Sequence, residues 1–355
     1  MNCNSFYFDS SKNEICLDNC GGMESASDIV KSTVVGTMAL LIIVGNIFCV
    51  VVLWKTKEIH FISRLFMASL TATDLTFGFL VVLPVAFSSA YNKWPVNHDF
   101  MCQFHEAATS ILGGALTMSL LGISIDRWIA VSKPLRYSTI VTQKRALILI
   151  TVLWILPLLF RLISTPAIGA YKLQFQSDSD MCWMCTRQTG HTVYTAGVGL
   201  FMLTPFVTTL FIYARLLRIA RRLARRIQPN SVPRNMDGEV FSAHAKSAIT
   251  FLLITATFGI CWMPFTGVWL YREITGENTH KYIVIFAEMT AFSSSWLDCL
   301  VYYYRSRAFK QTARTMIRKL CCKLRRQNTE QLSTIRTINV REANELECST
   351  TSDWK

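Results

Sequence analysis

Residues 32–54 read STVVGTMALLIIVGNIFCVVVLW, a run that contains no Asp, Glu, Lys or Arg. The hydrocarbon layer of a bilayer is about 30 Å thick, and a helix needs about 20 mostly apolar residues to cross it. Inside lipid every backbone N–H and C=O must be hydrogen-bonded within the protein, and a helix achieves this within one segment. The run therefore predicts a membrane-spanning helix.

Six further apolar segments have the same character. They lie at residues 65–91, 103–125, 146–169, 192–214, 247–271 and 282–304. Hydrophobic residues make up 51% of the 355-residue chain and charged residues 17%, whereas soluble domains average about 25% charged residues. These features exclude a soluble enzyme. They predict an all-α membrane protein, a bundle of seven transmembrane helices over residues 32–304.

The distribution of positive charge gives the expected orientation. Most of the 36 Lys and Arg residues lie between spans one and two, three and four, five and six, and after span seven. Because positively charged loops stay on the cytoplasmic side, we expect residues 1–31 to be extracellular and the chain to lie in the plasma membrane. The net charge of +13 then faces anionic lipids and cytoplasmic proteins rather than nucleic acid.

Five ionisable residues fall inside the predicted spans, where a charge is costly and usually functional. They are Asp74, Glu106, Arg161, Glu288 and Asp298. Glu106 and Arg161 lie near the outer surface, where a contact between helices explains them as well as a function does. Glu288 precedes Asp298 by about 15 Å of helix, so a water-soluble ligand that enters from outside could reach it.

Short motifs occur in order along the seven spans. They are Gly45-Asn46 in span one, Leu70-Thr-Ala-Thr-Asp74 in span two, Asp126-Arg127-Trp128 at the end of span three, Trp154 in span four, Pro205 and Tyr213 in span five, Phe258-Gly-Ile-Cys-Trp262-Met-Pro264 in span six, and Asp298-Cys-Leu-Val-Tyr302 in span seven. With these motifs the chain resembles the rhodopsin-like (class A) G-protein-coupled receptors over nearly its whole length. The resemblance implies a receptor that binds an extracellular ligand and activates heterotrimeric G proteins.

The resemblance also implies roles for the motif residues. Asp126 would hold Arg127 in the resting state, and Arg127 with Leu135 in the following loop would serve G-protein coupling. The activation switch would consist of Pro205, Tyr213, Phe258, Trp262, Pro264 and Tyr302. The polar core would consist of Asn46, Asp74 and Asp298.

Two departures from the family pattern affect these roles. Leu116 replaces the usual Ser beside Asp74, so sodium binding at Asp74 stays an open question. His244 stands where many relatives have an acidic residue near Arg127, so we expect a looser resting state and appreciable basal signalling.

The ligand is less clearly indicated. Within the family the nearest resemblance is to the biogenic-amine branch, in particular to the histamine type-2 kind. Amine receptors hold the ligand's ammonium with an Asp in span three, at the place where this chain has Thr109. Glu288 is the best substitute for that Asp. The expected pocket residues are Thr109, Phe265, Thr266, Trp269, Glu288 and Phe292. The ligand is expected to be a small molecule, with a cationic amine as the first candidate; the alternative is a receptor for a peptide, a lipid or a non-amine metabolite.

The family pattern also includes a disulfide at the outer face. It pairs Cys102, at the start of span three, with a cysteine of the second outer loop. Cys182 and Cys185 both qualify, and the spacing between Cys185 and Pro205, which is similar to that in amine receptors, favours Cys185.

The C-terminal region has two parts. Residues 305–320 place apolar side chains on one helical face with basic residues beside them, which predicts an amphipathic helix on the membrane surface. Cys321 and Cys322 at its end are predicted palmitoylation sites. Residues 321–355 are polar and contain Ser and Thr, which predicts a disordered cytoplasmic tail open to phosphorylation. Receptor kinases and arrestins are therefore further expected partners.

Other membrane-protein functions fit less well. An opsin needs a Lys in the middle of span seven for retinal, and residues 282–304 contain no Lys. A transporter would show internal repeats or several charges along one path. A zinc enzyme would need a second His after His105-Glu106, which the sequence lacks. We therefore expect no enzymatic activity, no cofactor, no metal centre and no nucleic-acid partner.

Overall fold

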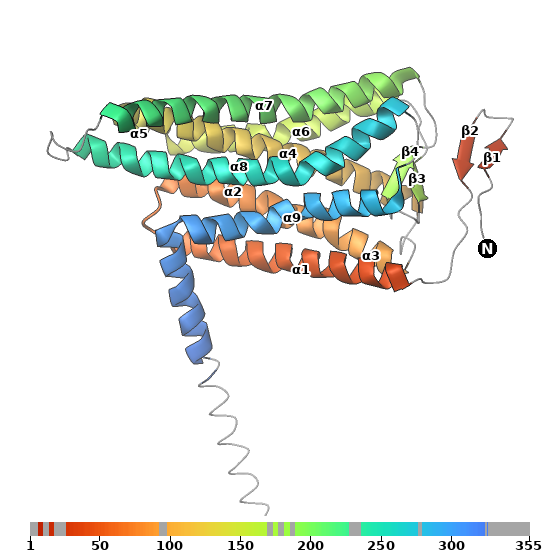
Figure 1. The fold of residues 1–355 in the computed structure, drawn as a ribbon, viewed down its shortest axis with the longest axis horizontal. Helices are drawn as coiled ribbons and strands as arrows, with labels where there is room; N and C mark the ends of the chain where they lie inside the picture. Colours follow the sequence, from red (N-terminus) through yellow and green to blue (C-terminus); the bar gives the residue numbers. More distant parts are fainter. Residues whose placement is uncertain are drawn as a thin grey trace, which may run out of the picture.

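The fold is a bundle of helices that run side by side (Figure 1). The computed structural model describes residues 6–9, 14–17, 26–91, 98–168, 173–176, 181–184, 189–226, 236–275, 279–323 and 325. Among these residues, seven helical stretches are long and apolar enough to cross a membrane. The prediction of a seven-helix membrane bundle is therefore confirmed.

The spans follow the chain in order. They are α1 (Ala26–Lys55), then α2 (Phe61–Phe77) continued by the π-helix η1 (Gly78–Val82) and by α3 (Leu83–Tyr91), then α4 (His98–Ser132), α6 (Gln143–Ile168), α7 (Thr189–Arg226), α8 (Met236–Thr275) and α9 (Lys281–Arg305). A short 3-10 helix, η2 (Pro134–Arg136), and α5 (Tyr137–Ile140) connect α4 to α6. A further helix over residues 307–323 follows α9, in the region of the predicted amphipathic helix.

Two short antiparallel hairpins, which the sequence analysis did not predict, lie outside the spans. Strand β1 (Phe6–Asp9) pairs with β2 (Glu14–Leu17), and β3 (Leu173–Gln176) pairs with β4 (Met181–Met184). Both hairpins lie at one end of the bundle, and the helix over 307–323 turns away from the opposite end (Figure 1). We call the first the hairpin end and the second the Arg127 end, because Arg127 lies near the C-terminus of α4 there.

The outer surface of the bundle suits lipid. Large apolar side chains point outward from several helices; Ile163 on α6, Leu200 on α7 and Ile260 on α8 are 74%, 66% and 67% exposed. A soluble protein would bury contiguous apolar surface of this extent. In a bilayer the same surface faces hydrocarbon.

A π-helical turn interrupts the second span and affects which residues face the interior. Pro84 has no N–H to donate and its ring crowds the carbonyl of the preceding turn. The chain responds with a wider turn, in which the backbone N–H of Leu83 donates to the carbonyl of Gly78. As a result the adjacent residues Val81 and Val82 are both fully buried.

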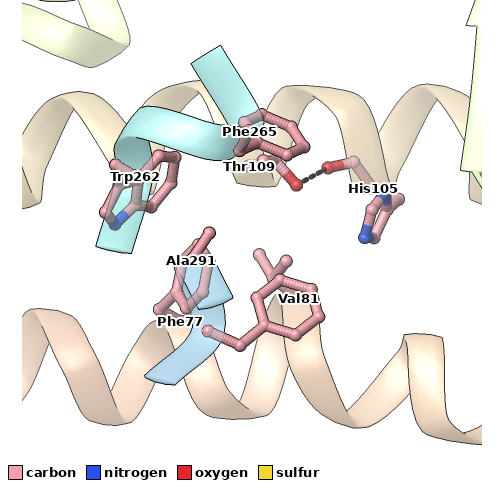
Figure 2. A pocket seen from close by; sticks show the side chains of 8 residues that line it. Phe77, Val81, His105, Thr109, Trp262, Phe265 and Ala291 are labelled. Atoms are coloured by element: carbon pink, nitrogen blue, oxygen red, sulfur yellow. Dashed lines mark hydrogen bonds between the residues drawn. The ribbon is translucent and has the colours of Figure 1, made fainter. Parts of the chain in front are cut away.

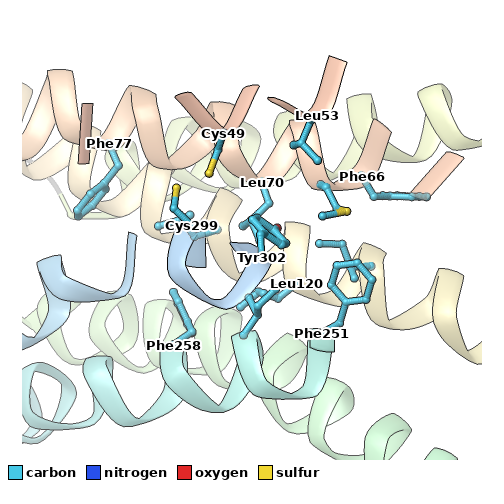
Figure 3. Packing of buried hydrophobic residues seen from close by; sticks show 14 of the residues in the cluster. Cys49, Leu53, Phe66, Leu70, Phe77, Leu120, Phe251, Phe258, Cys299 and Tyr302 are labelled. Atoms are coloured by element: carbon cyan, nitrogen blue, oxygen red, sulfur yellow. The ribbon is translucent and has the colours of Figure 1, made fainter. Parts of the chain in front are cut away.

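The core brings together buried residues of α1, α2, α4, α8 and α9 (Figure 3). Glycines let helices approach closely, as is common in membrane proteins. A Cβ added to Gly259 on α8 would lie 2.4 Å from Cζ of Phe206 on α7. A Cβ added to Gly122 on α4 would lie 2.6 Å from Cδ1 of Leu153 on α6. These contacts fix the distance of α7 from α8 and of α4 from α6.

Candidate functional site

A small cavity opens between four spans. The residues that line it are Phe77, Val81, His105, Thr109, Trp262, Phe265, Ala291 and Phe292. Figure 2 shows His105 and Thr109 on α4, Trp262 and Phe265 on α8, and Phe77 and Val81 on the second span, around the same space.

The walls of the cavity are mainly aromatic. The ring centroid of Phe77 lies 6.0 Å from that of Trp262 and 5.9 Å from that of Phe292. The ring of Phe265 meets Trp262 edge-on at 5.9 Å. Such a set of rings can pack against a flat aromatic group or attract a cation to the face of a ring.

Two residues of α4 that carry hydrogen-bonding groups, His105 and Thr109, also line the cavity, although the surface exposed to it is apolar. Thr109 donates its hydroxyl hydrogen to the backbone oxygen of His105 at 2.8 Å, so its oxygen is left as an acceptor for another group. His105 is buried and contributes an imidazole, which can donate or accept a hydrogen bond. The surface of the cavity therefore suits an apolar ring, with the hydrogen-bonding groups of His105 and Thr109 close by.

The expected pocket residues divide into two groups. Thr109, Phe265 and Phe292 line the cavity, together with Trp262 from the expected switch. Three other expected residues are not among the residues that line it: Glu288, Thr266 and Trp269.

These three residues have other surroundings. Glu288 is fully buried on α9, next to the apolar cluster of Val268, Val284 and Ala287. Thr266 is exposed, and its hydroxyl donates to the carbonyl of Trp262 at 2.9 Å. A Cβ added to Gly199 on α7 would lie 3.9 Å from the Trp269 ring.

Four cavity residues were missed from the sequence: Phe77, Val81, His105 and Ala291. His105 lies one helical turn before Thr109, and residues four apart share a helix face. The spacing from Thr109 could therefore have predicted that His105 lines the same cavity. Val81 carried no comparable signal, because its inward position depends on the π-helical turn.

Trp262 connects the cavity to the interior. Its indole Nε1–H donates to the hydroxyl of Ser294 on α9 at 3.2 Å, and Ser294 donates in turn to the carbonyl of Ala291 at 2.8 Å. Trp262 stacks on Phe258 with centroids 5.4 Å apart, and Phe258 lies 6.5 Å from Phe206 on α7. Pro264 lies inside α8 just beyond this stack, and Pro205 lies inside α7 next to Phe206.

A polar layer lies deeper in the bundle. The side-chain amide of Asn46 donates to the carbonyls of Ile42 and Ser295, at 2.9 and 3.1 Å. The thiol of Cys299 donates to Oδ1 of Asn46 at 3.4 Å. These bonds tie α1 to α9.

Two carboxylates belong to the same layer. Asp74 and Asp298 are both buried, and no described residue hydrogen-bonds Oδ2 of Asp74 or Oδ1 of Asp298. Across the part of the chain that the structure describes, no group of three or more His, Cys, Asp or Glu side chains could hold a metal ion.

Asp126 and Arg127 form a buried ion pair at the Arg127 end. Nε of Arg127 donates to Oδ2 of Asp126 at 2.9 Å, and Nη2 donates to the hydroxyl of Ser63 on α2 at 2.5 Å. The hydroxyl of Tyr137 on α5 donates to Oδ1 of Asp126 at 2.6 Å. Burial raises the pKa of the Tyr137 phenol above its ordinary value, and the negative charge of Asp126 raises this pKa further. Tyr137 therefore stays a donor at physiological pH.

The remaining expected residues lie as follows. Tyr213 on α7 and Tyr302 on α9 are buried in the core near the same end. Leu135 lies in η2, and its side chain falls outside the described residues. Arg161 on α6 and Glu106 on α4 form an ion pair between these helices.

Of the cysteines that were expected to form a disulfide or to carry lipid, those that the structure describes lie toward the two ends of the helical bundle. Cys102 is disulfide-bonded. Cys185 falls outside the described residues, and Cys182 lies in β4. Cys321 and Cys322, at the end of the helix over 307–323, are exposed free thiols.

Comparison with known proteins gives a family match over most of the bundle. Residues 45–302 match the family described as 7 transmembrane receptor (rhodopsin family). The chain is 27% identical to a QRFP-like peptide receptor of Branchiostoma floridae over 83% of this chain and 78% of the relative. It is 26% identical to the histamine H2 receptor of Cavia porcellus, over 90% and 87%. It is also 26% identical to the adenosine receptor A2a of Canis lupus familiaris, over 83% and 74%.

Proposed function

The chain belongs to the rhodopsin family of seven-transmembrane receptors and is a ligand-binding, G-protein-coupled receptor; from this premise we propose how it is oriented, what it binds and how it signals. The proposed orientation in the plasma membrane places the hairpin end outside and the Arg127 end in the cytoplasm. The excess of Lys and Arg in the segments at the Arg127 end supports this orientation.

The proposed ligand is a small molecule with an aromatic ring that binds in the cavity from the extracellular side. The main support for this proposal is the cavity itself, because its walls are aromatic and two of its lining residues, His105 and Thr109, carry hydrogen-bonding groups. Bound there, the ring would touch Trp262 and thereby act on α8.

A cationic amine is the first candidate for that ligand. The similarity to histamine H2 receptors supports it, and the aromatic rings would stabilise an ammonium group. Glu288, about one helical turn before the cavity residue Phe292 on the same span, would supply the negative charge after a local rearrangement.

A neutral ligand is the second candidate. No acidic residue is among the described residues that line the cavity, and Thr109 brings no charge. The similarity to the adenosine receptor and to the peptide receptor is about as strong as that to the histamine receptor.

Signalling would be a shift between two populations of the receptor. An agonist acts only through its greater affinity for the active state. Contact with Trp262 would disturb the stack with Phe258 and its hydrogen bond to Ser294, and α8 would pivot near Pro264, where the helix lacks a backbone hydrogen bond. The outward movement of α8 would free Arg127 to contact a G protein.

Further partners would act at the cytoplasmic face. In the helix over 307–323, Phe309 and Ala313 are buried while Ile317 and Leu320 are exposed, and basic residues flank them. This arrangement supports binding to the membrane surface, with lipid attached at Cys321 and Cys322. The tail, which lies outside the described residues, would be the substrate of receptor kinases and would bind arrestins once phosphorylated.

The test is a panel of aromatic amines, histamine, adenosine and neutral aromatic metabolites on transfected cells, with cyclic AMP and calcium as readouts. If the agonist is cationic, Glu288→Gln should abolish the response while surface expression persists. The same substitution at the loop residue Glu58, which is exposed, is the matched control. An unchanged dose–response curve for Glu288→Gln would remove Glu288 from the site.

A further inference from the structure

Arg127 touches an aromatic ring of α8 at the proposed coupling site. Cζ of Arg127 lies 5.5 Å from the centroid of the Phe251 ring. Both side chains are buried, at 2% and 3% exposure. Figure 3 shows Phe251 pointing from α8 into the bundle, where it belongs to the main apolar core.

The surroundings of the guanidinium favour this contact. A guanidinium is flat, and its N–H donors lie in its plane. Asp126 and Ser63 accept hydrogen bonds from those donors. An aromatic ring interacts best with the face of the ion, and the attraction grows when water is excluded.

We propose that Phe251 is a positioning residue that holds Arg127, and with it α8, in the resting conformation through a cation–π contact. The proposal rests on the proposed role of Arg127 in G-protein coupling. It concerns the energy difference between the two conformations of α8, because an outward swing of α8 would separate the ring from the guanidinium.

The sequence offers no acidic partner for Arg127 at the position on α8 where many relatives have one. Residue 244, about two helical turns before Phe251 on α8, is His and carries no fixed negative charge. A carboxylate at that point could pair with Arg127, but His cannot. Phe251 gives α4 and α8 an attraction at this end that needs no acidic residue.

Plain apolar packing is the competing explanation, and it makes a different prediction. If Phe251 only fills space, Leu should replace it nearly as well, because Leu is apolar and of similar size. If the ring face matters, Trp should replace Phe251 and Leu should not, since Trp is the strongest cation–π partner.

The first experiment measures the distance between α6 and α8 in the purified full-length receptor, without ligand or G protein. Spin labels are attached at Leu147→Cys and Ile249→Cys, two exposed sites on α6 and α8. The exposed thiols of Cys321 and Cys322 and that of Cys348 in the tail are replaced by Ser.

Phe251→Leu should raise the population with the longer distance about fivefold, and Phe251→Trp should leave it near the original level. The matched control is Phe211→Leu, which removes a comparable contact with Arg215, 5.0 Å from the ring, on the exposed face of α7. It should leave the distances unchanged. Equal distances in Phe251→Leu and the original receptor, or equal shifts in the Leu and Trp variants, would overturn the proposal.

A second measurement tests whether Phe251 acts through Arg127. In an Arg127→Met background the cation is gone, so Phe251→Leu should add no further shift in distance. A full additional shift in that background would show that the ring acts by packing alone and would overturn the proposal.

Nucleotide exchange on a purified G protein separates this proposal from the proposed function. With coupling as proposed, Phe251→Leu should raise basal exchange about as much as it raises the long-distance population. If the distances respond as expected while no variant stimulates exchange, the positioning role of Phe251 stands and the coupling role of Arg127 fails.

Discussion

Asp126 uses both of its carboxylate oxygens at the Arg127 end. One oxygen accepts from Arg127 and the other from Tyr137, at 2.9 and 2.6 Å. His60, before α2, packs its ring edge-on against Tyr137 with centroids 5.6 Å apart. Tyr137 thus links Asp126 to α5 and to the loop that precedes α2, which makes it the most informative single residue to change at this end.

Replacing Tyr137 with Phe should lower the free energy of unfolding by about 1.5–3 kcal/mol, the range for a hydrogen bond to a charged group. It should also raise basal signalling, because Asp126 loses one of the bonds that orient it toward Arg127. Thermal unfolding of the purified receptor and basal cyclic AMP output check the two effects. The control is Tyr304→Phe, since Tyr304 is 71% exposed.

The difference in unfolding free energy between the original receptor and Tyr137→Phe should not vary with pH between about 6 and 9. A phenol whose pKa is raised by folding contributes stability that is fully present below its ordinary value, about 10. That contribution is lost only as the pH rises through the higher value of the folded state. A difference between Tyr137→Phe and the original receptor that declines within pH 6–9 would contradict this assignment of the proton.

Thr109 is the residue whose replacement should change ligand preference most. It lies in the aromatic cavity, where an Asp would place a negative charge beside Trp262 and Phe265. Thr109→Asp should increase the affinity for phenethylamine or tryptamine at least about tenfold, because a desolvated charge pair discriminates strongly against unpaired partners. The affinity for neutral 2-phenylethanol should not increase.

Binding to the purified receptor measures this effect whether or not the amine is an agonist. Thr109→Asn is the matched control, since it has the same size as Asp without its charge. An equal gain in the Asn variant would show that polarity rather than charge is responsible. No gain with Asp would show that an ammonium does not reach this part of the cavity.

At the scale of the helices, hydropathy was sufficient to find the spans but not their ends. The third span was predicted to begin at residue 103, whereas α4 begins at His98 and continues to Ser132. Likewise α7 continues to Arg226, beyond the predicted apolar span 192–214, where Arg residues recur at helical spacing. Apolar runs mark where a helix crosses hydrocarbon, and polar turns beyond the hydrocarbon carry no such signal.

The cavity could be predicted only in part, for a related reason. Thr109, Phe265 and Phe292 were identified by their place in the family pattern. Val81 was not, because its position depends on the extra residue in the π-helical turn before Pro84. Glu288 was singled out by its charge, but it is buried and is not among the residues that line the cavity; the rotation of a helix about its axis is set by its packing partners, which the charge does not reveal.

Close packing of α7 against α8 leads to a prediction about Gly259. An added methyl group would meet the Phe206 ring at 2.4 Å, so the ring or the helices must shift. Gly259→Ala should therefore lower the free energy of unfolding by about 1–3 kcal/mol relative to a matched control, the usual cost of overpacking.

Gly267→Ala is that control, because it lies on the same helix and has nothing within 4 Å of an added Cβ. Both substitutions change intrinsic helix propensity equally, so their difference reports packing alone. Thermal unfolding of the two purified variants measures it. Equal melting temperatures would mean that the Phe206 ring or the two helices can shift without cost.

At the scale of the whole molecule, the cavity and the proposed coupling site at Arg127 are separate places with the buried apolar core between them. The cavity touches Trp262, which stacks on Phe258, and both belong to α8, as does Phe251 against Arg127. Because α8 contacts both places, binding at either one can shift the equilibrium between the two conformations of this helix. Linkage then requires that a G protein bound at Arg127 raises agonist affinity by the same factor by which the agonist raises affinity for the G protein.

Signalling across a membrane further requires that the two places face opposite sides of it, which sets the last prediction. An epitope tag placed before residue 1 should bind antibody on intact cells, and a tag after residue 355 should bind only after permeabilisation. The seven candidate spans among the described residues, an odd number, would place the two ends on opposite sides, and the basic segments at the Arg127 end predict which side is cytoplasmic.

Replacing basic residues near the end of α7 provides the control. Changing Arg215 and Arg218 to Gln weakens the charge bias at one loop but leaves the others intact, so the orientation should persist. Antibody access to the C-terminal tag on intact cells would reverse the assignment of the two faces. The ligand cavity would then open toward the cytoplasm, and the receptor could not report an extracellular molecule.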